Sequence, residues 1–132
     1  PMVVNRRQLR ELDHLASQQF VSELLAHMKE ATPRLCQGLA EREILRRIHL
    51  AIRAAESFGI TTRRSTWRYV HLLFEIGDSE SGAPSSPVAM AILNDSHHDA
   101  RLKVSRLWRA YREGRVSARP QVAAAAQAGG LG

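Results

Sequence analysis

Apolar residues recur along most of this chain at intervals of three and four, the spacing that places them on one face of an α-helix. The first stripe predicts a helix from about Gln8 to Ala31, which Pro33 ends. A second helix follows Gly38 and ends at Phe58-Gly59-Ile60, where glycine suits the left-handed conformation that closes many helices. The stripe residues are Leu9, Leu12, Ala16, Phe20, Leu24 and Met28 in the first helix, and Leu45, Ile48, Ile52 and Ala55 in the second.

The middle of the chain predicts a third helix with a wide apolar face. Thr62 and Ser65 are both good N-caps, and the apolar pattern continues from there to Gly77. A polar, turn-rich gap then covers residues 78–86. Ser86 precedes Pro87, and a proline at the first helical position predicts a short helix to about Leu93.

The last predicted helix, from about His98 or Asp99 to Glu113, has the clearest division between its two sides. Its apolar side holds Val104, Leu107, Trp108, Ala110 and Tyr111, and Leu102 is out of place. The opposite side forms what we call the basic ridge, Arg101, Arg106, Arg109 and Arg112.

The expected fold is therefore all-α, a compact bundle of four to five helices with a flexible C-terminal tail. A length of 132 residues suits one domain. We assign residues 1–114 to the helical domain. The tail, residues 115–132, is low in complexity and has no core-forming pattern, so we expect it to be disordered or ordered by a partner.

The net charge of +6 lies mostly at the C-terminal end, because residues 96–132 hold seven Lys and Arg against two Asp and Glu. No apolar run approaches the ~20 residues that a membrane-spanning helix needs. The first residues lack the apolar stretch of a signal peptide, so we expect a cytoplasmic protein without membrane contact. With Cys36 alone, one chain can form no disulfide and no thiolate metal cluster.

Residues that could support catalysis or bind a metal are few. His97, His98 and Asp99 are adjacent, but helix neighbours point to different sides, so we interpret them as a polar cluster at a helix start, capped by Asp95 or Ser96. Glu41 and Glu43 indicate a solvated surface, and Cys36 has no assignable base. His27 and His49 lie near apolar stripes without a visible partner. We predict no catalytic residues, no metal and no cofactor.

Two surfaces could bind a partner. The basic ridge could neutralise nucleic-acid phosphates, or it could be a solvated face or one that meets an acidic protein. In the aromatic third helix, Trp67 and Tyr69 are two residues apart and cannot share a face, so at least one is a candidate surface anchor. The predicted partner-binding residues are Arg63, Arg64, Trp67, Tyr69, Trp108 and Tyr111.

Three runs carry a resemblance to a known family. They are FVSELLAHM (residues 20–28), FGITTRRSTWRYVHLLFEIG (58–77) and SPVAMAILND (86–95). They resemble small helical bacterial proteins of unknown mechanism encoded in type VI secretion gene clusters, beside effectors and spike components. The family often has acidic residues before the aromatic helix and a tryptophan after the second proline, where this chain has Arg63-Arg64 and Val88.

The resemblance implies an accessory role in one of three forms. The first is a cytosolic adaptor or chaperone that binds a secreted effector or spike component. The second is a cytosolic immunity protein that neutralises a toxin, against which the basic ridge counts, since inhibitors of nucleic-acid-degrading toxins favour acidic surfaces. The third is a nucleic-acid binder that uses the basic ridge. The sequence leaves the oligomeric state open.

Overall fold

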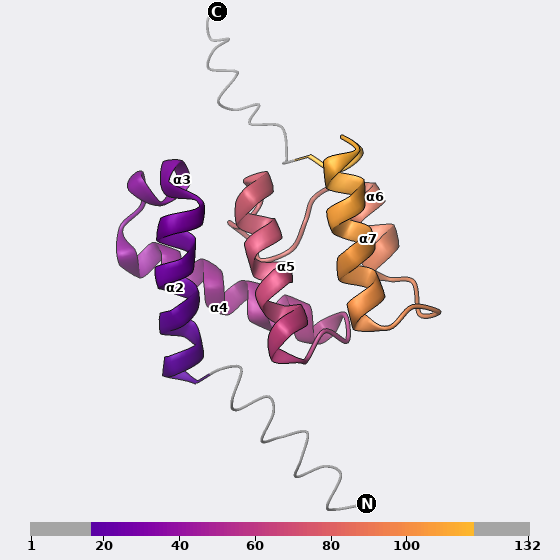
Figure 1. The fold of residues 1–132 in the computed structure, drawn as a ribbon, viewed down its shortest axis with the longest axis horizontal. Helices are drawn as coiled ribbons and strands as arrows, with labels where there is room; N and C mark the ends of the chain where they lie inside the picture. The colour runs from indigo at the N-terminus through magenta and orange to yellow at the C-terminus, as the bar shows by residue number, and fades with distance from the viewer. Residues whose placement is uncertain (1–16, 118–132) are drawn as a thin grey trace, which may run out of the picture.

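Residues 17–117 are described by a computed structural model of the chain (Figure 1). Within them every regular element is an α-helix, which confirms the predicted all-α class, although six helices are present where four to five were expected. The additional element is a single short helix after Pro33. The helices are α2 (Gln18–Ala31), α3 (Pro33–Gln37), α4 (Glu41–Ser57), α5 (Arg63–Ile76), α6 (Pro87–Leu93) and α7 (Ala100–Arg112).

Side-chain caps set the beginnings of four helices. Thr62 accepts a hydrogen bond from the Ser65 backbone N–H at the start of α5, and Ser86 caps α6 in the same way, as predicted. The cap of α7 is Asp99, and not Asp95 or Ser96. The first helix differs more, because Ser17 is extended and caps α2, so the predicted continuous helix from about Gln8 is wrong at this point. Its earlier residues lie outside the described part.

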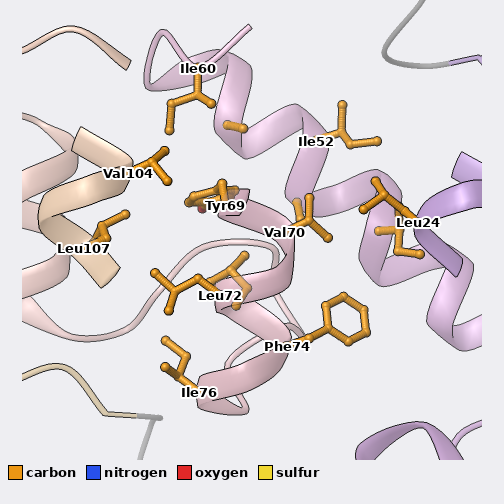
Figure 2. Packing of buried hydrophobic residues seen from close by; sticks show 14 of the residues in the cluster. Leu24, Ile52, Ile60, Tyr69, Val70, Leu72, Phe74, Ile76, Val104 and Leu107 are labelled. Atoms are coloured by element: carbon orange, nitrogen blue, oxygen red, sulfur yellow. The ribbon is translucent and has the colours of Figure 1, made fainter. Parts of the chain in front are cut away.

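Helix α5 lies between α2 on one side and α7 on the other, while α4 passes across the back of α2 and α5 (Figure 1). Both long sides of α5 are therefore covered. Figure 2 shows Val70 and Phe74 pointing towards the α2 side, and Tyr69 and Leu72 towards α7. The core thus consists of two halves that share α5.

Within α4 the buried stripe contains most of the predicted one. Ile48, Ile52 and Ala55 are buried as predicted, whereas Leu45 is only half-buried. Ile44 and Ala51, which were not predicted, are buried as well, so the pattern located the inward face with an error at one end.

The loop after α5, residues 77–86, is packed onto the helices. The Tyr69 hydroxyl donates to the Gly82 carbonyl at 2.9 Å. Asp78 Oδ2 accepts hydrogen bonds from the backbone N–H and the hydroxyl of Ser85. Gly82 has φ +84°, and a Cβ there would lie 2.6 Å from the Leu50 backbone, so only glycine fits this approach. Four residues of this polar loop, Asp78, Ser79, Gly82 and Pro84, are buried.

The core also extends past its expected end at residue 114. Val116 is 2% exposed, and the Arg115 N–H donates to the Ala110 carbonyl beyond the end of α7. Lys103, in the middle of α7, is buried and donates from Nζ to the Phe58 carbonyl at the end of α4. A cation is favourable there because helix C-termini carry partial negative charge. Residues 118–132 of the expected tail lie outside the described part.

Candidate functional site

The two aromatic residues proposed as anchors on α5 have different surroundings. Tyr69 is fully buried, and burial together with the nearby Asp78 carboxylate raises the pKa of its hydroxyl. It cannot contact a partner, and its prediction as a partner-binding residue is corrected. Trp67 is half-buried, with its ring 6.1 Å from that of Phe20 and 5.0 Å from that of His27. Part of the Trp67 ring therefore stays at the surface.

A row of half-buried rings crosses α2, α5 and α7, and we call it the histidine–aromatic band. Neighbouring ring centroids are separated by 4.7 Å between His27 and His71, by 5.4 Å between His71 and Trp108, and by 6.1 Å between Trp108 and Tyr111. The Trp108 Nε1–H donates to a backbone carbonyl of α5, which fixes that ring. Its members are His27, Trp67, His71, Trp108 and Tyr111.

The two histidines at the centre of the band are partners of each other. His27 Nε2 lies 3.2 Å from His71 Nδ1, and Glu75 lies 3.6 Å from the other ring nitrogen of His71. Burial, and then the neighbouring His27, lower the pKa of His71, while Glu75 acts in the opposite direction. The sequence showed no partner for His27, because the pair joins residues 44 apart.

Beside the band, Trp67 lines a groove of about 510 Å³ that we call the tryptophan groove. Its other lining residues are Arg63, Arg64 and Arg68, all on α5. Arg63 lies over the Phe20 ring, 4.8 Å from its centroid, and forms an ion pair with Glu23 of α2. The groove thus combines an aromatic ring with guanidinium groups, one of which is fixed against α2.

A second depression, of about 630 Å³, lies where the N-terminal ends of α5 and α7 meet. We call it the arginine pocket. It is adjacent to the tryptophan groove, because Arg64 and Arg68 line both. Its lining residues are Thr62, Arg64, Ser65, Arg68, Asp99, Ala100 and Arg101.

The four arginines of the basic ridge are all exposed, in agreement with the predicted division of α7. Within residues 17–117 none of them forms an ion pair with a carboxylate, and Arg106 contacts the His98 ring at 3.5 Å. Their positions differ in one respect. Arg101 lines the arginine pocket, whereas Arg106 and Arg109 line a separate groove of about 260 Å³ with Leu102 and Arg115.

The remaining polar groups considered in the sequence, around Asp95 and at Cys36, make contacts within the fold. Asp95 accepts a hydrogen bond from the His97 N–H, which lowers the pKa of the carboxylate, and His98 Nδ1 lies 3.2 Å from it. Cys36 is buried next to the Thr32 hydroxyl. In the described part of the chain no three His, Cys, Asp or Glu residues are grouped as metal ligands.

Part of the band could have been found from spacing alone. Trp67 and His71 are four residues apart on α5, and Trp108 and Tyr111 are three apart on α7, so each pair shares a helix face. The contribution of α2 through His27, and the meeting of two helix starts at the arginine pocket, depend on tertiary packing.

Comparisons with protein-family models, with curated proteins and with solved structures found no match. Among residues 17–117, no helix combines the length and the apolar character that crossing a membrane requires.

Proposed function

We propose that the protein is a non-catalytic adaptor that binds another protein through the tryptophan groove. The observation that carries this proposal is the composition of the groove, a half-buried Trp67 among three arginines. Tryptophan and arginine are the residue types most enriched at the energetic centres of protein interfaces. The groove therefore has the character of an anchor site.

The ring of Trp67 is held in place before any partner arrives. Phe20 and His27 of α2 contact one side of it, which limits its rotation in the free protein. An anchor that is already ordered loses little conformational entropy on binding. This favours a partner that inserts an apolar group against the exposed part of the ring.

The positive charge of the tryptophan groove indicates which side chains a partner would present to it. Arg64 and Arg68 have no carboxylate partner within residues 17–117, so the groove favours acidic side chains around the apolar contact. In the setting implied by the resemblance, the partner is a secreted type VI effector or spike component, bound in the cytosol.

The test is co-expression with the products of neighbouring genes, followed by affinity purification and light scattering on the eluted complex. We expect a defined complex with one of them. Trp67→Ala should weaken it by about 2 kcal/mol or more, as truncation of an interface anchor does. Isothermal titration calorimetry on the purified pair measures this loss.

Val88→Ala is the matched control, because Val88 is an exposed apolar residue on α6, outside the groove. It should leave the affinity unchanged. Equal affinities of the Trp67→Ala and wild-type proteins would contradict the proposal. If co-expression of the protein abolishes the toxicity of its partner, the immunity role is favoured instead. If the protein purifies without a protein partner but with nucleic acid that high salt removes, nucleic-acid binding is favoured.

A further inference from the structure

We propose that the arginine pocket binds a phosphate group. This inference rests on a different depression from the one that carries the proposed function. Three guanidinium groups, from Arg64, Arg68 and Arg101, line a pocket of about 630 Å³. Volumes of this size are typical of small-ligand sites.

The charges of the pocket are mostly uncompensated. The side chains of Arg64 and Arg101 have no hydrogen-bonded or ion-paired partner within residues 17–117, and the Arg68 side chain makes only a 3.5 Å contact with the Ser105 hydroxyl. Asp99 is the one carboxylate in the lining, and its Oδ1 accepts the Leu102 N–H as the cap of α7. Three cations against one anion leave two positive charges, which match a phosphate dianion.

The pocket also holds neutral hydrogen-bond donors. Ser65 is only 7% exposed and lines the pocket, and its hydroxyl has no hydrogen-bond partner in the described part of the chain. The N–H groups of Arg64, Ala100 and Arg101 belong to the first turns of α5 and α7, where no intrahelical acceptor exists. Helix starts bind anions through such N–H groups and the helix dipole.

This donor set fits phosphate better than a carboxylate. Planar guanidinium groups bind two phosphate oxygens at once, and a tetrahedral anion can accept from several directions. Guanidinium groups from two helices, the hydroxyl of a largely buried serine and two helix starts line one pocket. The ligand could supply its phosphate as the free ion or as the terminal group of a nucleotide.

The experiment is calorimetric titration of the full-length protein in a low-salt buffer at pH 7.5 with three probes. These are inorganic phosphate, adenosine monophosphate and a short single-stranded oligonucleotide without a terminal phosphate. We expect saturable binding of inorganic phosphate, and tighter binding of the nucleotide if its ring adds contacts. Arg101→Gln should weaken this binding by about tenfold or more, since it removes a charge-assisted hydrogen bond.

Arg109→Gln is the control, because it removes the same charge from the same helix outside the pocket. It should change phosphate affinity less than about twofold, the small effect of a distant surface charge. Arg64→Gln is a second pocket variant, and thermal melting checks that each variant folds. Absence of saturation up to about 10 mM phosphate would overturn the proposal.

Two further results decide between specific and general binding. Equal losses of phosphate affinity in Arg101→Gln and Arg109→Gln would overturn the proposed phosphate site in favour of unspecific attraction by the basic ridge. Binding of the oligonucleotide without binding of phosphate or the nucleotide would do the same. The proposed adaptor function is tested separately. Trp67 is absent from the pocket and Arg101 from the tryptophan groove, so each proposal can fail without the other.

Discussion

At the scale of single residues, the Tyr69 hydroxyl links α5 to the loop after it. It is buried and donates to the Gly82 carbonyl, in a loop that approaches the Leu50 backbone closely. This hydrogen bond therefore helps to hold in place a loop that rests on α4. A buried carbonyl left without its donor is costly, because nothing replaces the lost partner.

We expect Tyr69→Phe to lower the free energy of unfolding by about 1–2 kcal/mol through this unpaired carbonyl. Tyr111→Phe is the matched control, since Tyr111 is half-buried and its hydroxyl has no hydrogen-bond partner among the described residues. It should change stability by less than about 0.5 kcal/mol. Urea denaturation of the three proteins measures both effects, and equal stabilities would show that the bond contributes nothing.

Sequence spacing separated Trp67 from Tyr69 correctly but could not say which ring is buried. Two residues on a helix point in different directions whichever side faces the core. The choice depends on Gly82, thirteen residues from Tyr69, and on Phe20 and His27, which come from α2. Such distant contacts leave no signal in the local pattern.

At the scale of the elements, packing between α2 and α5 links the stability of the fold to the protonation of His71. Burial and His27 hold the pKa of His71 below its ordinary value of 6.5. The unfolded chain therefore takes up the proton at a higher pH than the folded chain. The stability that depends on neutral His71 is fully present above pH 6.5 and is lost as the pH falls through the lower, folded pKa.

We expect the free energy of unfolding to decrease as the pH falls below 6.5, and His71→Gln to reduce this decrease. Denaturant titrations at several pH values above 5 measure it. Glu43 contributes to the pH dependence of stability at lower pH values, because hydrogen bonds from Arg46 and Arg47 bring its pKa to about 2. His49→Gln, at an exposed position on α4, serves as the control variant. A pH dependence unchanged by His71→Gln would contradict this assignment.

Helix positions were the part of the fold best predicted from sequence. Thr62, Ser86 and Gly77 marked ends that the structure confirms, because capping is a local property of a few residues. The interruption at Ser17 was missed, since the apolar spacing continues across it. The short helix after Pro33 was missed too, because proline ends one helix and begins another equally well.

At the scale of the whole molecule, the chain beyond α7 completes the core. Val116 is buried although the sequence around it has no core-forming pattern, because a single apolar residue has no periodicity. The predicted boundary at 114 therefore divides the packed unit.

We expect a chain ending at residue 114 to be less stable than one ending at residue 117 by about 1–2 kcal/mol. This difference is the free energy gained by burying one valine side chain, less the conformational entropy lost when the backbone around it is ordered. Thermal and urea unfolding of the two truncated chains measure the difference. Identical midpoints would mean that Val116 adds nothing to the core.

The bond between Lys103 and the Phe58 carbonyl has a consequence for synthesis of the chain. It joins residues 45 positions apart, and α7 also covers one side of α5. While the ribosome is still adding the residues before α7, the end of α4 lacks this cation and the Tyr69 side of α5 lacks its cover. The nascent chain thus exposes the side of α5 that faces α7 until α7 emerges, a period in which exposed apolar surface favours association with other chains.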